Sequence, residues 1–199
     1  MKLIGITQRV EFIEDYNEKR DCLDKKWSEF LLRCNLIPVI LPNNIECAKN
    51  IIRSINLDGF LFTGGNNLVK YGGQEQERDN LERFCMNYAI ENRLPIIGVC
   101  RGMQFIQDYF GVNLEKLHNH VAVEHEIKLG ENNIVVNSYH SWGAKDTVSD
   151  LIVKACSKDK VIEAVKHKYY DIYGIMWHPE RVSPFSESDI EFFEKAFLV

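Results

Sequence analysis

The sequence predicts an α/β fold in which a mixed, mainly parallel central sheet is flanked by helices and carries an antiparallel β flank. In the first half of the 199 residues, short apolar runs alternate with longer amphipathic stretches, which is the pattern of β-α-β units. These runs are apolar on both faces, as parallel strands are when helices cover them on either side. After Gly111 the pattern changes to short strands separated by turns, which favours antiparallel pairing. We therefore expect one domain spanning residues 1–199.

The individual elements follow from the apolar period and from turn signals such as the glycine pairs at 64–65 and 72–73. In the first half, the sequence predicts strands at residues 2–7, 37–41, 59–63 and 95–99. Helices are predicted at residues 21–34, 47–55, within 76–92 and 101–110. The second half has predicted strands at residues 112–117, 124–129, 133–138, 151–155, 161–165 and 172–177, and a closing helix at 188–197.

Composition and charge argue against several classes of protein. With 24 basic and 29 acidic residues the formal charge is −5, whereas nucleic-acid modules usually carry a basic excess, so we expect no nucleic-acid partner. The longest apolar stretches, at residues 36–42 and 94–100, are far shorter than the roughly 20 residues that span a bilayer, so we expect no membrane partner. Six dispersed cysteines without a CxxC pair, and no clustered histidines, indicate a reducing cytoplasmic location, no disulfide framework and no zinc site.

The strongest local signal is a cysteine between two glycines, in the segment IGVCRGMQ at residues 97–104. A strand ends and an amphipathic helix begins directly after Cys100, so this segment has the form of a nucleophile elbow. Glycines two residues before and after the cysteine allow a sharp turn that exposes the central side chain at the carboxyl edge of the sheet. The helix start favours a thiolate, and the N–H of Arg101 can donate to an oxyanion. A buried packing cysteine is the alternative, and it suits the other five cysteines.

A base for this thiol is predicted in the segment GIMWHPE at residues 174–180. A strand ends at His178, and Pro179 stops further pairing. Glu180 is spaced to accept a hydrogen bond from the far ring nitrogen, which fixes the tautomer and stabilises the imidazolium. Of the six histidines only His178 has this arrangement, although a purely structural histidine is the alternative when the motif is taken alone.

A third signal is the diglycine Gly64-Gly65, which ends another predicted strand. In a parallel sheet this loop lies at the same edge as the elbow, so one of its N–H groups can complete an oxyanion hole with that of Arg101. An ordinary turn between a strand and a loop is the alternative.

With these three pieces, the chain resembles the class I glutamine amidotransferases and, within them, the stand-alone γ-glutamyl hydrolases, over nearly its whole length. The resemblance implies their flavodoxin-like fold. The nucleophile and base motifs together are highly specific, and the other segments support them. The matching segments are IGIT at 4–7, LFTGG at 61–65, YG at 71–72 with Arg78, Asp79 and Glu82, GVCRGMQ at 98–104, VNSYH at 136–140 and WHPE at 177–180.

The resemblance also implies roles for the matching residues. Cys100 attacks a γ-amide carbonyl, His178 shuttles the proton and Glu180 orients His178, while N–H groups of Arg101 and of the diglycine hold the oxyanion. Binding of the glutamyl group is implied for Gln104, Asn137, Ser138, Tyr139 and His140. Spacing by itself supports only Gln104, which lies one helical turn beyond Cys100.

The implied reaction is hydrolysis of a γ-glutamyl amide through a γ-glutamyl thioester, releasing glutamate and an amine without a metal or organic cofactor. A more specific implied substrate is γ-glutamyl-CDP-amidate, cleaved to CDP-amidate and glutamate in capsular polysaccharide biosynthesis. Such a leaving group needs positive charge near the mouth of the site, for which Arg9, Lys70 and Arg78 are candidates; solvated surface charge is the alternative. Trp142 and Met176 stand where relatives often carry glutamines, so the identity of the leaving amine stays open.

Other functions stay open at this point. A glutaminase subunit that delivers ammonia to a separate synthetase would need a partner chain, since no synthetase domain is fused here. A catalytically silent binding protein on the same fold is a further alternative, against which the intact triad argues. Elbow-cysteine proteins of a chaperone- and protease-like group share the turn but generally lack the WHPE ending. An exposed apolar patch would support a homodimer, which a single sequence does not show.

Overall fold

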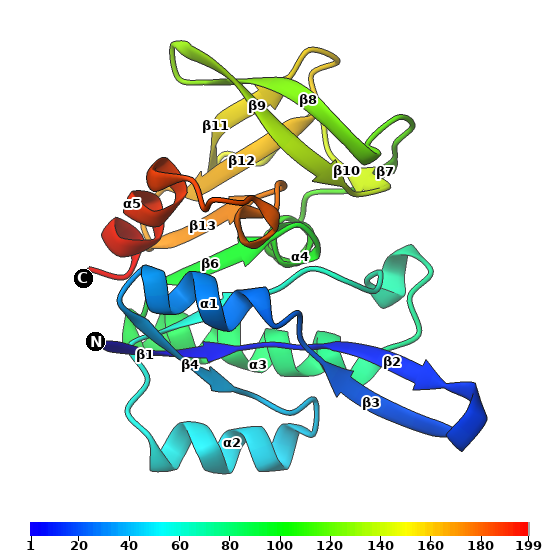
Figure 1. Ribbon diagram of the computed structural model, residues 1–199, viewed down its shortest axis with the longest axis vertical. Helices are drawn as coiled ribbons and strands as arrows, with labels where there is room; N and C mark the ends of the chain where they lie inside the picture. The colour runs from blue at the N-terminus through cyan, green and yellow to red at the C-terminus, as the bar shows by residue number, and fades with distance from the viewer. Residues whose placement is uncertain (199) are drawn as a thin grey trace.

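The computed structural model describes residues 1–198 and has a nine-stranded mixed sheet at its centre (Figure 1). The first five strands in sheet order are parallel, and the other four are antiparallel. This confirms the predicted fold class. The sheet order is β4 (Leu36–Ile40), β1 (Lys2–Ile6), β5 (Gly59–Phe62), β6 (Ile96–Val99), β13 (Ile172–Ile175), β12 (Ile162–His167), β11 (Leu151–Ser157), β8 (Val121–Leu129) and β9 (Asn132–Tyr139).

Helices cover both faces of the parallel part of the sheet (Figure 1). On one face, α1 (Lys26–Arg33) and α5 (Glu187–Ala196) contribute aromatic side chains to a buried cluster, in which the Phe30 and Phe193 rings meet edge to face at 4.9 Å. On the other face lie α2 (Ile45–Ser54), α3 (Gln76–Asn92) and α4 (Arg101–Tyr109). The strands β5 and β6 between them are buried along their whole length, as the apolar runs predict.

The predicted helix at residues 21–34 is wrong in its first turn, because β3 (Glu18–Cys22) occupies that stretch and α1 begins only at Lys26. β3 pairs with β2 (Arg9–Ile13) in a hairpin that projects beyond the sheet (Figure 1). Four of the five β3 residues are charged and exposed, so the strand lacks the apolar alternation that signals a strand.

A second correction concerns residues 112–117, predicted as a strand. Only β7 (Glu115–Lys116) pairs there, with β10 (Trp142–Gly143). The backbone donors before it are taken elsewhere: the N–H of Val112 donates to the Gln107 carbonyl at 2.9 Å, and that of Leu114 to the Tyr71 hydroxyl at 3.0 Å. Likewise, β13 ends at Ile175 rather than at residue 177.

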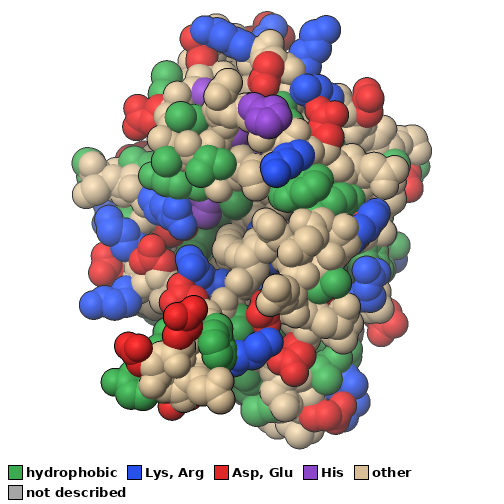
Figure 2. Space-filling model, turned by 90° about the vertical axis from the view of Figure 1, so that its right-hand side faces the viewer, with side chains coloured by type: hydrophobic (Ala, Val, Ile, Leu, Met, Phe, Trp, Pro, Cys, Tyr) green, Lys and Arg blue, Asp and Glu red, His purple; other side chains and the backbone are tan. Residues whose placement is uncertain are grey.

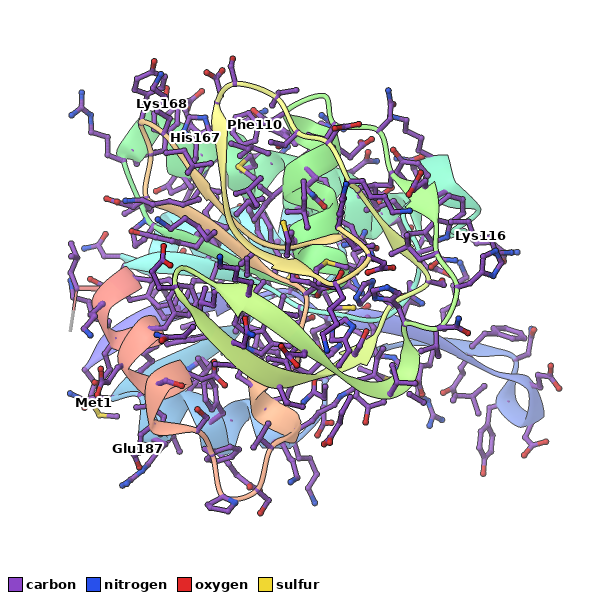
Figure 3. All side chains as sticks on the ribbon, turned by 90° about the horizontal axis from the view of Figure 1, so that it is seen from above. Met1, Phe110, Lys116, His167, Lys168 and Glu187 are labelled. Carbon is purple, nitrogen blue, oxygen red and sulfur yellow. The ribbon has the colours of Figure 1, made fainter. Side chains whose placement is uncertain are left out.

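His167 illustrates a histidine with a purely local structural role. Seen from above, it lies beside Phe110 (Figure 3), with ring centroids 4.5 Å apart. Its Nδ1 accepts the backbone N–H groups of Tyr169 and Tyr170 at 3.1 and 3.2 Å. Within residues 1–198, none of the helices has the length and apolar character needed to cross a membrane.

Candidate active site

Three adjacent parallel strands bring the three predicted motifs together. β6 lies between β5 and β13, so the segments that follow these strands share one carboxyl edge of the sheet. A Cβ atom added to Gly64 would lie 2.8 Å from His178 Cε1 and 3.5 Å from the Cβ of Cys100. The diglycine, the cysteine and the histidine are therefore in direct contact. Figure 2 faces this edge and shows the surface hollowed near its middle.

Cys100 has the strained backbone of a nucleophile elbow. Its φ of 53° and ψ of −107° lie outside the regions that L residues favour. Its N–H donates to the Ile175 carbonyl at 2.8 Å, which fixes the turn against β13. A Cβ atom added to Gly98 would lie 2.5 Å from the Gly102 carbonyl. A Cβ atom added to Gly102 would lie 2.1 Å from the Phe62 carbonyl. Both glycines are thus required by close backbone packing.

His178 is buried, bound to Glu180 and close to Cys100. Its Nδ1 lies 2.7 Å from Glu180 Oε1, and its Cε1 and Nε2 lie on the side of Gly64, as does the Cβ of Cys100. Burial by itself lowers the pKa of His178, but negative charge on the Cys100 sulfur and on the Glu180 carboxylate outweighs this and raises the pKa to about 9. The imidazolium is therefore the stable form at neutral pH.

This pairing makes a prediction about pH. Because the pKa of folded His178 lies above the ordinary value of 6.5, its proton stabilises the folded chain fully below that pH, and the contribution disappears as the pH rises through about 9. In a Glu180→Gln variant we expect the titration midpoint of the His178 ring to move to lower pH, because the carboxylate charge that favours the imidazolium is lost. An NMR titration of the ring, assigned with His178→Gln, measures both midpoints.

Glu191→Gln, on the exposed side of α5, is the matched control for this titration. Within residues 1–198 the only partner of this carboxylate is Lys195, so the midpoint of His178 should stay in place. An equal midpoint in the wild-type and Glu180→Gln proteins would contradict the role of Glu180 in holding the proton.

Asn137 positions the histidine rather than facing a substrate. Its side-chain amide donates to the His178 carbonyl at 2.9 Å, and its carbonyl accepts the His178 N–H at 2.8 Å. Both polar groups of Asn137 are thereby used. The next residue on β9, Ser138, is buried and donates its hydroxyl to the His120 carbonyl at 2.6 Å. Asn137 and Ser138 therefore bind backbone groups in this structure, and neither lines the cavity that contains Cys100.

The predicted oxyanion donors lie on two rigid supports. Arg101 is the first residue of α4, where an N–H has no intrahelical acceptor. Gly65 has a φ of +84°, and an added Cβ would lie 2.9 Å from Arg9 Cδ, so only glycine fits. The Arg78 guanidinium donates to the carbonyls of Thr63 at 2.7 Å, Gly64 at 3.1 Å and Gly65 at 2.5 Å, which fixes the diglycine loop from beneath.

Arg78 belongs to a buried charge cluster and does not lie at the mouth of the site as the sequence suggested. Glu82 accepts from Arg78 Nε at 3.1 Å and from the Thr7 hydroxyl at 2.9 Å, and it also pairs with the Arg101 side chain. Arg101 pairs in addition with Asp79. Burial, with repulsion from Arg101, lowers the pKa of Arg78 to about 9 despite these carboxylates. The cluster ties the diglycine loop to the elbow.

Two cavities flank the Cys100–His178 pair. One, of about 310 Å³, is lined by Arg9, Asp24, Gly65, His178 and Arg181 among others, and we name it the Arg9 cavity. The second, of about 270 Å³, is named the Gln104 cavity, and its wall includes Gly65, Cys100, Gln104, Tyr139, His140 and Ser141. Gly65 lines both. Of the pair, His178 lines the Arg9 cavity and Cys100 lines the Gln104 cavity.

Some of the residues that the sequence predicts to bind substrate line one of the two cavities, and others do not. Gln104, Tyr139 and His140 line the Gln104 cavity, and Arg9 lines the other. Lys70, however, lines neither cavity, because Asp108 on α4 binds its ammonium at 2.7 Å. Sequence reasoning missed Arg181, which lies above the Tyr139 ring at 4.5 Å and lines the Arg9 cavity. Its adjacency to Glu180 was the available signal.

The chain is similar in sequence to known proteins over most of its length. A family model described as Glutamine amidotransferase class-I matches residues 25–198. The γ-glutamyl-CDP-amidate hydrolase of Campylobacter jejuni is 35% identical over 185 residues, which cover 89% of this chain and 90% of that protein. The γ-glutamyl-γ-aminobutyrate hydrolase of Escherichia coli O157:H7 is 28% identical over 200 residues, covering 79% and 78%.

A solved structure shows the same fold. A GMP synthase subunit from Thermoplasma acidophilum superposes with a TM-score of 0.74 at 19% identity, over 99% of this chain and 92% of that one. This similarity concerns the fold, whereas the family model and the 35% identical relative concern the sequence. The chain belongs to the class I glutamine amidotransferase family.

Proposed function

We propose that this protein is a cysteine-dependent hydrolase of γ-glutamyl amides. The observation that carries the proposal is the placement of Cys100, in a strained elbow, against a buried His178 that is bound to Glu180. This is the arrangement of an activated nucleophile with an oriented base. The relatives named for hydrolysis of γ-glutamyl compounds support the same reaction class.

In the first half-reaction, Cys100 Sγ attacks the γ-carbonyl carbon of the substrate. The carbonyl oxygen becomes an oxyanion that accepts hydrogen bonds from the N–H groups of Arg101 and of Gly65 or Gly64. His178 then gives its proton to the amide nitrogen as the C–N bond breaks, so a neutral amine leaves. A γ-glutamyl thioester remains on Cys100.

Water completes the reaction. His178, now neutral, takes a proton from the attacking water while the oxygen bonds to the thioester carbon. Collapse of the second oxyanion breaks the C–S bond and releases glutamate, and the thiolate and imidazolium are restored. Glu180 holds the ring in one orientation through both halves.

We place the two halves of the substrate in the two cavities. The Gln104 cavity takes the glutamyl group, since it opens directly on Cys100 and presents Gln104 and Ser141 as polar partners. The Arg9 cavity, on the His178 side, takes the amine that accepts the proton. Arg9, which pairs with Glu11 at 2.5 Å, and Arg181 both line this cavity, and guanidinium groups suit a leaving group with phosphate oxygens when the phosphate takes the place of the carboxylate.

On this basis we propose γ-glutamyl-CDP-amidate as the substrate, in agreement with the activity named for the 35% identical relative. A place in capsular polysaccharide biosynthesis stays a prediction. The first experiment measures glutamate release by the purified chain from γ-glutamyl-CDP-amidate, from uncharged γ-glutamyl amines and from glutamine. We expect the nucleotide amidate to have the highest kcat/KM.

The Arg9→Gln variant tests the leaving-group assignment. Loss of one charge-assisted hydrogen bond costs about 1.5–3 kcal/mol, so kcat/KM for the nucleotide amidate should fall about 10- to 100-fold while that for glutamine is unchanged. Lys70→Gln is the matched control, because Lys70 is bound to Asp108 and lines neither cavity. Equal losses with both substrates would contradict a phosphate contact. Silence on every conjugate would instead favour a glutaminase subunit that needs a synthetase partner.

A further inference from the structure

Four side chains outside the proposed catalytic machinery meet inside the antiparallel flank. His120 precedes β8, His125 lies on β8, His140 follows β9, and Glu163 lies on β12. One carboxylate oxygen, Oε1 of Glu163, is 3.6 Å from His120 Nδ1, from His125 Nε2 and from His140 Nε2. The sequence predicted no such group, because these residues are spread over 44 positions and converge only when β8, β9 and β12 join one sheet.

These atoms are buried and have no other partners. Within residues 1–198, none of the three facing nitrogens and neither oxygen of Glu163 has a hydrogen-bond partner. Glu163 is fully buried, and His120 and His140 are 3% and 2% exposed. A separation of 3.6 Å is too long for a hydrogen bond. Five unpartnered buried polar atoms at one point would be costly unless something binds between them.

His120 and His140 each form a hydrogen bond on the side away from Glu163, and these bonds determine which ring nitrogens carry protons. His120 Nε2 lies 3.0 Å from Asp159 Oδ2 and His140 Nδ1 lies 3.2 Å from the Trp142 carbonyl. Both oxygens only accept, so these nitrogens carry the hydrogen. In a neutral ring the opposite nitrogen then presents a lone pair. With both rings neutral, two imidazole lone pairs point at a carboxylate oxygen, and a bound cation would satisfy all three groups.

We propose that His120, His125 and Glu163 form a binding site for one divalent transition-metal ion, with Zn²⁺ as the best match and with His140 as the adjoining side chain. Imidazole and carboxylate groups suit zinc. In a tetrahedral site with metal–ligand distances of roughly 2.0–2.2 Å, neighbouring donor atoms are about 3.4 Å apart, close to the 3.6 Å from Glu163 Oε1 to the nitrogens of His120 and His125. The ligand atoms of these three residues lie within 4.8 Å of one another, in a group that does not include His140.

The groups that hold the histidine rings from behind are also typical of a metal site. A carboxylate behind His120 and a backbone carbonyl behind His140 are the partners that orient metal-binding imidazoles. Asp159 is itself held by the Ser157 hydroxyl at 2.5 Å. His125 has a side chain that is 17% exposed, which gives an ion a route of entry.

The ion would act structurally on the Gln104 cavity. It would join the β8–β9 hairpin to β12 next to His140, which lines that cavity. The Trp142 carbonyl that orients His140 also accepts from Gln104 Nε2 at 2.9 Å. The Trp142 carbonyl therefore links His140 to Gln104 in the wall of the Gln104 cavity. The reaction proposed above does not involve the ion.

The test measures metal binding and thermal unfolding of the full chain, so it does not depend on activity. After treatment with a chelator, we expect Zn²⁺ to bind with a stoichiometry of one by calorimetry and to raise Tm. The same result is expected for Cys100→Ser, which removes the other strong zinc ligand near a histidine. Co²⁺ should give the visible absorption of a tetrahedral site.

Glu163→Gln should weaken Zn²⁺ binding by at least 100-fold. Because this buried change could prevent folding, Asp159→Asn is the second variant: its side chain is 54% exposed, and loss of an outer partner typically costs 10- to 100-fold in metal affinity. His118→Gln, at an exposed histidine two residues from His120, is the control and should bind normally. Absence of binding in the wild-type chain, or binding lost in Cys100→Ser but kept in Asp159→Asn, would overturn the proposal.

Discussion

Replacing Cys100 by alanine is expected to lower turnover of a γ-glutamyl amide by about 10⁵- to 10⁶-fold, the loss seen when a catalytic nucleophile is removed. The fold should survive, because Cys100 is held by its backbone N–H bond to Ile175 rather than by its side chain. Steady-state glutamate release by wild-type and variant proteins measures the effect. Acid quenching during turnover should also reveal a protein mass increased by one glutamyl group, and only in the wild type.

The other cysteines provide the controls for this prediction. Cys47 is exposed on α2, so Cys47→Ala removes the most accessible thiol and should leave turnover unchanged. Burial raises the pKa of the Cys34 thiol to about 12, which keeps it unreactive at neutral pH. Full turnover in Cys100→Ala would eliminate the thioester mechanism, and loss of turnover in Cys47→Ala would show that the assay reports something other than the elbow thiol.

The second large effect is expected from Glu82→Gln, which should lower the free energy of unfolding by about 3–5 kcal/mol. Glu82 is fully buried and is bound by two guanidinium groups and one hydroxyl. The amide keeps the shape but removes the charge, which leaves Arg78 and Arg101 buried with only the partly buried Asp79 to balance them. For a chain of this size, we expect Tm to fall by roughly 6–20 °C.

Chemical denaturation and thermal scans measure this loss. Glu46→Gln is the matched control, since the Glu46 side chain is 75% exposed and pairs only with Lys49. That change should stay within about 0.5 kcal/mol of wild type. If Glu82→Gln were as stable as the control, the charge cluster would not hold the diglycine loop against the elbow.

The elbow and the main helices could be predicted because their causes are local. At residues 98–102, glycines on either side of Cys100 are demanded by backbone contacts within a few residues and with the neighbouring strand. The helix predicted within 76–92 runs over Gln76–Asn92, where the buried residues Leu81, Cys85 and Ala89 recur every four positions. Each of these signals is complete within a short stretch of sequence.

The β2–β3 hairpin could not be predicted in the same way. It has few buried side chains, and its anchors come from distant loops. Asn66 binds the N–H and the carbonyl of Val10 at 2.8 and 2.9 Å, and Asn43 binds Asp21 through its backbone and its side chain. Polar contacts of this kind leave no periodic pattern.

The sequence by itself determined the mixed sheet, the Cys100 elbow and the WHPE segment that holds His178 and Glu180. Only the tertiary structure decided that β13 lies beside β6 and brings the histidine to the thiol. It also decided that Asn137 and Ser138 bind backbone groups, that Lys70 pairs with Asp108, and that three distant histidines surround Glu163. The physical reason is that local sterics and apolar period are written in neighbouring residues, whereas the partner of a polar side chain depends on which strands pair.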